Sequence, residues 1–299
     1  MTVFVPGTKS WPLALAKGDL VRIVAPASAL ADRSAFESGV AVLEGFGLKP
    51  EWDPGIFSVD QMWAGSDQRR AQELDAAFSV ANVKAVFCAR GGYGCTRILP
   101  LLRTQAWSSR WWVGFSDATA IHAVCPFGSL LAANVVTLAS ATAQDQEQLR
   151  MCLFGEQATG ACIAKGHGHG HGQGRVTATL TGGNLSVLSR LLGTPAMPSL
   201  RGQIVVLEDW HEKTYRLDRM WTHLLQASDV QAAAGFALGE FAIDGDDLWE
   251  PNAWICNAVS KLGKPMVSHL PFGHGAQHRP VPLGVPVTLD AQAGLLEWA

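Results

Sequence analysis

The chain has little charge and lacks the segments that mark nucleic-acid binding, secretion or membrane insertion. Only 16% of its 299 residues are charged, the formal net charge is −3, and no basic run occurs. This composition argues against nucleic acid as the main partner, because clustered Lys and Arg side chains bind phosphate backbones. No apolar stretch reaches 18 residues, and residues 1–11 carry no apolar signal-peptide core. We therefore expect a cytoplasmic protein with no membrane partner.

The cysteines form no C-x-x-C pair of the kind found in zinc sites and redox motifs. Six are scattered along the chain: Cys88, Cys95, Cys125, Cys152, Cys162 and Cys256. We expect reduced and mostly buried thiols, as is usual in proteins of a reducing compartment.

Residues 166–172 read Gly-His-Gly-His-Gly-His-Gly and carry no side chain for a core. The three histidines, His167, His169 and His171, could bind zinc or nickel adventitiously. A catalytic zinc, however, needs ligands that rigid elements hold in place. We interpret residues 161–175 as a flexible linker between two domains. The sequence thus predicts no metal site and no other cofactor.

Hydrophobic residues make up 48% of the chain, which is enough for a substantial core. Between residues 19 and 141, short apolar runs alternate with helical patterns, such as a strand at 20–25 and a helix at 34–45. This alternation predicts an α/β fold whose N-terminal domain, 1–160, holds a mostly parallel sheet flanked by helices. Residues 176–299 predict a smaller, β-rich C-terminal domain.

A candidate nucleophile lies in residues 114–118, Gly-Phe-Ser-Asp-Ala, after the buried run Trp-Trp-Val and before a helical pattern. A serine on a sharp strand-to-helix turn between small residues is typical of a nucleophile elbow, which exposes the hydroxyl above the sheet. The backbone N–H of Asp117 then points toward the same space, as an oxyanion donor at a helix N-terminus. A Ser-Asp pair that opens a helix is also typical of a simple N-cap, so Ser116 stays a candidate at this point.

A serine hydroxyl is a poor nucleophile at neutral pH and needs a base, which in turn needs an orienting group. Glu208 follows the apolar run 204–207, where a carboxylate is awkward unless it is paired. His274 lies between two glycines on a predicted loop and fits the role of base. A solvated strand end and a turn histidine are the plainer interpretations of these two residues. His269 and His278 are alternative bases.

These residues belong to a set of motifs that resembles the LD-carboxypeptidases, a family of serine peptidases. The family includes murein tetrapeptide carboxypeptidases and microcin-immunity hydrolases. The motifs occur in the family's order and span most of the chain: ARGGYG at 89–94, GFSDAT at 114–119, GGNL at 182–185, LED at 207–209 and FGHG at 272–275.

The resemblance implies a Ser116–Glu208–His274 triad in a cytosolic homodimer with no metal cofactor. It implies a two-domain fold with the serine in the N-terminal half and the other two residues in the C-terminal half. The implied substrate is a murein peptide, from which the enzyme releases the terminal D-alanine through an acyl-enzyme during cell-wall recycling. We expect the backbone of Asp117 and of Gly91 or Gly92 to form the oxyanion hole. The residues expected to contact substrate are Arg90, Tyr93, Asn184 and Trp210.

Two other functions remain open from the sequence. A hydrolase of the microcin-immunity type would cleave an acyl link in an aminoacyl-nucleotide conjugate, with Trp210 as an aromatic platform for the base. A ligand-binding protein without catalysis could use the same α/β scaffold. The ordered Ser, Glu and His motifs disfavour the binding protein, because binding alone needs no such set.

Overall fold

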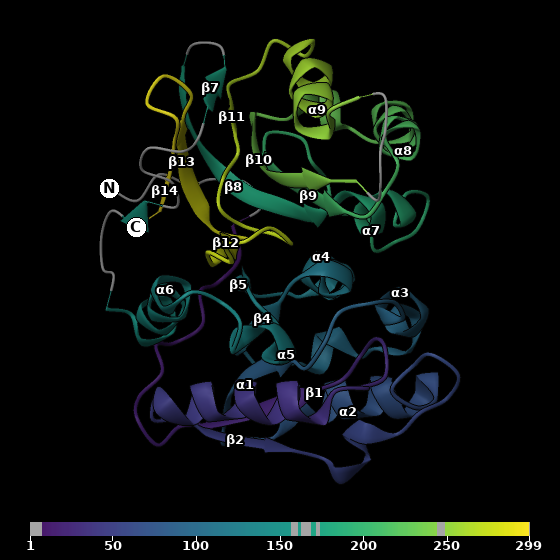
Figure 1. The fold of residues 1–299 in the computed structure, drawn as a ribbon, viewed down its shortest axis with the longest axis vertical. Helices are drawn as coiled ribbons and strands as arrows, with labels where there is room; N and C mark the ends of the chain where they lie inside the picture. Colours follow the sequence, from purple (N-terminus) through teal and green to yellow (C-terminus); the bar gives the residue numbers. More distant parts are fainter. Residues whose placement is uncertain (1–7, 157–160, 163–168, 172–173, 244–248, 299) are drawn as a thin grey trace. The chain divides into compact units, whose positions relative to one another are not determined.

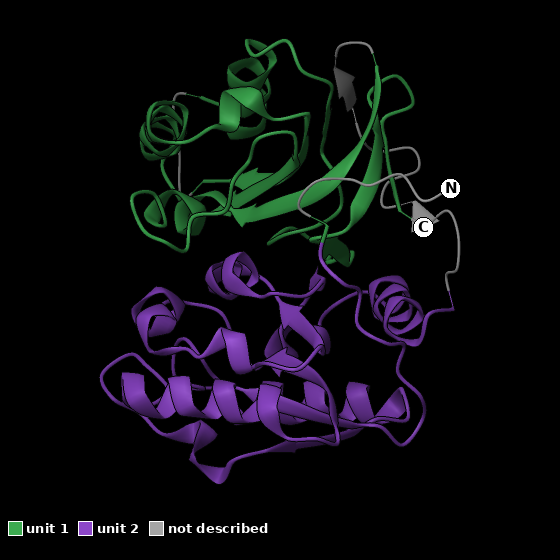
Figure 2. Cartoon of the chain, turned by 180° about the vertical axis from the view of Figure 1, so that it is seen from behind, with its two compact units in different colours: residues 1–8, 157–299 green, residues 9–156 purple. Residues whose placement is uncertain are grey.

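The computed structural model describes residues 8–156, 161–162, 169–171, 174–243 and 249–298 of the chain (Figure 1). It divides into two compact units (Figure 2). We call residues 9–156 the α/β unit, and residues 1–8 together with 157–299 the C-terminal unit. No helix among the described residues is long and apolar enough to cross a membrane.

The α/β unit is built on a parallel sheet, as the strand–helix alternation predicted. The central strands are apolar and almost fully buried, because helices cover both faces of such a sheet. In spatial order the strands of this unit are β5 (Ser129–Leu131), β4 (Trp111–Gly114), β3 (Val83–Cys88), β1 (Leu20–Val24) and β2 (Lys49–Trp52).

Two long helices begin at side-chain caps that the sequence provides. Asp32 accepts the N–H of Ala35 at the start of α1 (Arg33–Gly45), which packs against α5. Ser66 caps α2 (Asp67–Ser79), which packs against β1 and β3. The other helical segments of this unit are α3 (Cys95–Ile98), α4 (Thr119–Val124), α5 (Val135–Leu138), α6 (Ala143–Phe154), η1 (Pro54–Phe57), η2 (Leu99–Leu101), η3 (Thr104–Ala106) and η4 (Ser116–Ala118).

The described residues of the C-terminal unit form a mixed sheet of eight strands, which agrees with the predicted β-rich domain. In spatial order they are β6 (Ala161–Cys162), β14 (Leu295–Trp298), β13 (Pro286–Asp290), β8 (Arg175–Asn184), β9 (Ile204–Trp210), β10 (Gly235–Ala242), β11 (Met266–Ser268) and β7 (His169–His171). The run from β8 to β11 is parallel, and the outer pairs are antiparallel. The remaining elements are α7 (Leu185–Arg190), α8 (Thr214–Ala227), α9 (Pro251–Ser260), η5 (Val230–Ala232) and β12 (Val281–Leu283).

Part of the Gly/His tract, which we interpreted as a linker, is a strand. Residues 169–171 form β7 and pair antiparallel with β11, Met266 opposite His171. A two-residue repeat of Gly and His matches the two-residue repeat of a β-strand. His167 lies outside the described residues.

The cysteines whose side chains the structure describes are free and buried: Cys88, Cys95, Cys125, Cys152 and Cys256. This agrees with the expected reduced and mostly buried thiols. Burial raises the pKa of the Cys152 thiol to about 12, so this side chain stays neutral and unreactive at physiological pH.

Candidate active site

Ser116 lies on a sharp turn between β4 and α4. Its backbone has φ +63°, a conformation that costs a non-glycine residue about 1–3 kcal/mol and is found preferentially at functional sites. Phe115 before it is extended, with φ −143° and ψ −174°, and the 3-10 segment η4 begins at the serine. This strand–turn–helix geometry is that of a nucleophile elbow, and it leaves the Ser116 side chain half-buried rather than enclosed.

Close packing explains why small residues surround the serine. A Cβ on Gly114 would lie 2.7 Å from Cys88 Cβ and 3.0 Å from Ala118 Cβ. The turn therefore rests directly on β3, and a larger side chain would push Ser116 out of place.

His122, in helix α4 after the serine turn, contacts the end of strand β4. Its Nε2 lies 2.8 Å from the carbonyl oxygen of Gly114, and its Nδ1 lies 2.8 Å from Ser129 Oγ. Since a carbonyl oxygen only accepts, Nε2 carries the proton and Nδ1 accepts from the serine hydroxyl. Burial lowers the pKa of His122 to about 4, so the ring is neutral at physiological pH.

Asn134 is a buried part of the turn that the sequence reasoning missed. Its Oδ1 accepts the backbone N–H of Phe115 at 3.2 Å, and its side chain is 3% exposed. Its Nδ2 lies toward Gly91, because a Cβ built on that glycine would be 3.3 Å from this nitrogen. One amide thus abuts both the serine turn and the glycine loop. An asparagine before a four-residue helix carries no local sequence signal for such a role.

The glycine loop after β3 lies against the serine. A Cβ on Gly91 would stand 2.9 Å from Ser116 Cβ and 3.0 Å from Ser116 Oγ, so only glycine leaves room for the hydroxyl. Gly92 has φ +102° and faces Ser28, whose hydroxyl accepts the N–H of Tyr93 at 3.1 Å. The structure therefore brings the predicted loop and the predicted nucleophile together within the α/β unit.

Three predicted site residues of this unit have other contacts as well. The carboxylate of Asp117 accepts the N–H of Cys95 at 2.7 Å, and burial raises its pKa. The guanidinium of Arg90 donates to the carbonyl oxygen of Ala29 at 2.9 Å. Tyr93 is 44% exposed and lies near Trp63, with 6.2 Å between ring centroids. Among the three, Tyr93 has the side chain most accessible to a ligand.

In the C-terminal unit, Glu208 and His274 form a close pair. Strand β9 extends through Glu208 to Trp210, so this carboxylate lies inside a strand and not at its end, and it is fully buried. Its Oε2 lies 2.7 Å from His274 Nδ1, and its Oε1 accepts the side-chain N–H of Asn184 at 3.1 Å. Gly273, with φ +95°, permits the approach, because a Cβ there would stand 2.7 Å from Glu208 Oε2.

The pair fixes the protonation of the imidazole. Burial lowers the pKa of His274, but the charge of Glu208 and its hydrogen bond outweigh burial and leave the pKa above its usual value. A carboxylate on Nδ1 makes that nitrogen the donor, so Nε2 carries the lone pair of the neutral ring. This is the arrangement that a general base requires.

The two alternative bases contact other groups. His278 Nδ1 lies 2.9 Å from the carbonyl oxygen of Gly273 and so supports the loop that carries His274. His269 Nδ1 lies 3.0 Å from Ser268 Oγ. The geometry therefore favours His274 as the partner of Glu208.

Asp209 is a second buried carboxyl group beside the pair. It accepts the backbone N–H and the hydroxyl of Ser186 at 2.7 and 2.8 Å, and the N–H of Trp210 at 2.8 Å. Burial, followed by the charge of Glu208, raises the pKa of Asp209 to about 7. The exposed indole of Trp210 lies beside the His274 ring.

The predicted residues thus form two sets, one in each unit. Ser116 and Gly91 lie in the α/β unit, and Glu208, His274 and Trp210 lie in the C-terminal unit. Among the described residues, no group of three or more His, Cys, Asp or Glu side chains is arranged to hold a metal ion.

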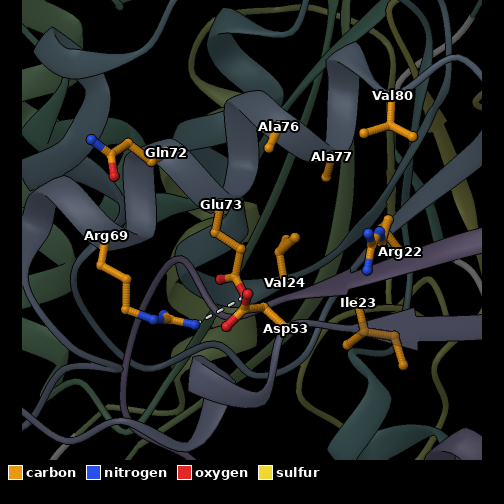
Figure 3. Close-up of a pocket in the computed structure, with 10 residues that line it drawn as sticks. All are labelled: Arg22, Ile23, Val24, Asp53, Arg69, Gln72, Glu73, Ala76, Ala77 and Val80. Atoms are coloured by element: carbon orange, nitrogen blue, oxygen red, sulfur yellow. Dashed lines mark hydrogen bonds and ion pairs between the residues drawn. The ribbon is translucent and has the colours of Figure 1, made fainter.

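A pocket of about 300 Å³ in the α/β unit contains none of the predicted site residues (Figure 3). It lies between β1 and α2, and Figure 3 shows Arg69 and Glu73 pointing toward one another inside it. These two side chains are 3.0 Å apart, and Glu73 also accepts the N–H of Ala25 at 3.1 Å. Arg69 and Glu73 therefore have hydrogen-bonding partners within the protein, and we assign the pocket no function.

Comparison with known proteins identifies the family of the chain. The LD-carboxypeptidase N-terminal domain matches residues 21–128, and the LD-carboxypeptidase C-terminal domain matches residues 177–289. The chain is 31% identical to the murein tetrapeptide carboxypeptidase of Pseudomonas aeruginosa over 93% of this chain and 94% of that protein. It belongs to the LD-carboxypeptidase family.

Other members and structures extend the comparison. A provisionally named carboxypeptidase of Streptomyces coelicolor is 36% identical over 95% of this chain and 94% of that protein. A solved structure of MccF in complex with glutamyl sulfamoyl guanosine has a TM-score of 0.86 at 18% identity, covering 97% of this chain and 98% of that one. The family matches confirm the resemblance read from the motifs at the level of the LD-carboxypeptidase family, and the relatives in Pseudomonas aeruginosa and Streptomyces coelicolor are named as carboxypeptidases.

Proposed function

We propose that this protein is a serine carboxypeptidase that releases the terminal D-alanine from murein tetrapeptides during cell-wall recycling. The observation that carries the proposal is the buried Glu208 carboxylate on His274 Nδ1, at 2.7 Å. A carboxylate–imidazole pair of this kind activates a hydroxyl nucleophile, and Ser116 on its strained turn is the matching hydroxyl. The name of the Pseudomonas aeruginosa relative supports the substrate class.

The proposed reaction begins when Ser116 Oγ attacks the scissile carbonyl carbon while His274 Nε2 takes the hydroxyl proton. The C–N bond of the tetrahedral intermediate then breaks, and His274 delivers the proton to the departing amine of D-alanine. A water molecule, deprotonated by His274, attacks the acyl carbon; the bond from this carbon to Ser116 Oγ then breaks, and His274 returns the proton to Oγ as the shortened peptide leaves. Glu208 fixes the imidazole tautomer and stabilises the imidazolium. The mechanism requires the two units to bring Ser116 Oγ within hydrogen-bond reach of His274 Nε2.

The proposed oxyanion hole consists of the backbone N–H of Asp117 and that of Gly91 or Gly92. The contact between Gly91 and the Ser116 side chain supports a donor from this loop. Loss of one such donor typically costs about 3–4 kcal/mol in the activation barrier.

The four proposed substrate contacts fall into two pairs. Tyr93 and Trp210 are exposed, which suits direct contact with the peptide. Arg90 and Asn184 already bind Ala29 and Glu208, so we propose that any contact with substrate is secondary to their support of the loop and the carboxylate.

The test is a panel of murein peptides that differ in length and in the chirality of the penultimate residue. We expect release of one alanine from a tetrapeptide that ends in an L-centre followed by D-alanine. We expect no cleavage of the pentapeptide that ends in D-alanyl-D-alanine, because the fixed serine and donors can attack only one face of the carbonyl. Mass spectrometry reads both outcomes, and Ser116→Ala is the control. Cleavage of the pentapeptide by the unaltered enzyme would contradict the proposal.

A second candidate is hydrolysis of an aminoacyl-nucleotide conjugate, as in microcin immunity. Trp210, 36% exposed beside His274, favours it, since an exposed indole can stack on a base. Incubation with an aminoacyl sulfamoyl adenosine separates the two candidates. Hydrolysis of the conjugate, with the murein tetrapeptide left intact, would replace the peptidase proposal.

We also propose, from the family resemblance, that the enzyme acts in the cytoplasm as a homodimer without a metal cofactor. Light scattering after size exclusion measures the mass. A single species at the mass of one 31.9 kDa chain would contradict the dimer.

A further inference from the structure

We propose that Trp210 is a positioning residue that acts through His274: its indole holds the imidazole in orientation and stabilises the ring when it carries a second proton. The two rings are nearly parallel, with 18° between their planes and 6.1 Å between centroids. The His274 side chain is 20% exposed, and Trp210 is 36% exposed. The role of this contact in catalysis rests on the proposed function, but the contact and its effect on His274 do not.

One strand provides both neighbours of the imidazole. Glu208 and Trp210 are two residues apart on β9, so their side chains leave the same face of the sheet. Glu208 meets the ring edge at Nδ1, and Trp210 lies against its face. A ring held at Nδ1 alone can still tilt about that hydrogen bond, and the indole restricts this tilt.

The backbone of Trp210 is fixed where the strand ends. Its N–H donates to Asp209 Oδ1 at 2.8 Å, and it pairs with Ala242 of β10. His211 follows with φ +61°, and its N–H donates to the Ala242 carbonyl oxygen at 3.0 Å. The indole therefore projects from an anchored backbone position, although the residue is 36% exposed.

The charged surroundings of His274 come from several elements. Glu208 and Asp209 lie on β9, and the ring of His211 lies 5.1 Å from that of Trp210. Next to His274 in the chain, a Cβ on Gly275 would overlap the carboxylate of Glu240 on β10, and His278 binds the loop at Gly273. Against this background the indole adds an attraction that acts only on the cationic ring.

In the proposed reaction, this attraction stabilises the state in which His274 has taken the proton of Ser116 and is cationic. An interaction present in the transition state and absent in the ground state raises kcat and leaves KM unchanged. A Trp210 that merely contacted substrate would have the opposite signature, since its loss would raise KM.

The test compares Trp210→Phe with Trp210→Leu, which both keep an apolar side chain over the ring, but only phenylalanine keeps a π face. NMR titration of the His274 ring protons, assigned with His274→Asn, gives the pKa in the free protein without any substrate. We expect the pKa in Trp210→Leu to lie about half a unit below that in Trp210→Phe. Trp249→Leu, which removes another exposed indole of the same unit, is the control and should leave His274 unchanged.

Kinetics on whichever substrate the enzyme cleaves provide the second readout. We expect kcat to fall about tenfold in Trp210→Leu and less in Trp210→Phe. Both variants keep an apolar side chain for the proposed contact with substrate, so KM should stay within about twofold in both. Equal His274 pKa values in the two variants would overturn the proposal, as would a rise in KM with unchanged kcat. A wrong substrate class would leave the titration result intact, so failure of the proposed function and failure of this inference are distinguishable.

Discussion

The Nδ1 atom of His274 lies 2.7 Å from Oε2 of Glu208, although 66 residues separate them in the chain. The carboxylate has no exposed surface, and a second hydrogen bond, from Asn184, holds its other oxygen. A buried carboxylate is costly unless it is paired and hydrogen-bonded, and here both conditions are met. This pair fixes which imidazole nitrogen faces outward, and the catalytic predictions follow from it.

Removal of Ser116 or His274 should abolish turnover without unfolding the protein. Ser116→Ala deletes one oxygen from a half-buried turn, and His274→Ala removes the base. The double variant should be little worse than either single one, because members of a triad act as a unit. Steady-state rates and urea unfolding measure these effects. A nearly normal rate in His274→Ala together with an inactive His269→Ala or His278→Ala would show that another histidine is the base.

Gly91→Ala should inactivate the enzyme while it leaves most of the stability. The new Cβ would lie 2.9 Å from Ser116 Cβ and 3.0 Å from Oγ, so it would push the hydroxyl from its position. A misplacement of this size can lower the rate about 10²-fold. Gly45→Ala in α1 is the matched control, because its Cβ would meet nothing within 4 Å. Equal activities in the two variants would show that Gly91 is not needed to leave room for the Ser116 hydroxyl.

The sequence predicted the α/β unit well because the evidence for it is local. Apolar runs such as 85–88 and 111–114 are buried at every position, which produces the continuous hydrophobic pattern of parallel strands. Other features depend on distant contacts. Gly182, in the GGNL motif, lies inside β8, where a Cβ would overlap the carbonyl oxygen of Val206 on the neighbouring strand. The pairing of β7 with β11 likewise has no local signal.

The residues of the candidate site also differ in whether a local sequence pattern or a distant contact reveals them. Ser116 and its glycine loop carry motifs that can be read directly from the sequence, and Glu208 and His274 follow from the family resemblance. Asn134 could not be found, because its partner, Phe115, is 19 residues away and an isolated asparagine has many uses. Asn184 was expected to contact substrate. Its hydrogen bond with Glu208 depends on the pairing of β8 with β9, which the sequence does not reveal.

The protein should lose stability on mild acidification because of His122. Its pKa is about 4 in the folded state against 6.5 for an unperturbed ring, so between these values the unfolded state binds a proton and the folded state does not. The stability from this group is complete above pH 6.5 and falls with pH, by about 2 kcal/mol at pH 5. Urea unfolding at pH 7 and pH 5 measures the loss.

His122→Gln isolates this contribution, since the variant keeps a polar side chain but cannot take the proton. We expect its stability to change less between pH 7 and pH 5 than that of the unaltered protein. Identical pH dependence in the two proteins would show that His122 is not the responsible group.

The Gly/His tract should be dispensable for catalysis. Replacement of His167, His169 and His171 together by serine should leave kcat/KM within a few-fold, and EDTA should not inhibit. The physical reason is that glycine on either side of each histidine gives no preorganised ligand set. Loss of most activity in either experiment would indicate a metal-dependent enzyme, and the role of Ser116 would have to be reconsidered.

Asn134 should prove to be a positioning residue of the nucleophile turn. Asn134→Ala removes the acceptor of the Phe115 N–H, which should lower the free energy of unfolding by about 1–3 kcal/mol and lower kcat at least tenfold. Asn134→Asp keeps that acceptor but places a negative oxygen near Gly91, beside the proposed oxyanion hole. It should therefore lower kcat strongly while it costs less stability than the alanine variant. Full activity in Asn134→Asp would show that the amide serves the fold alone.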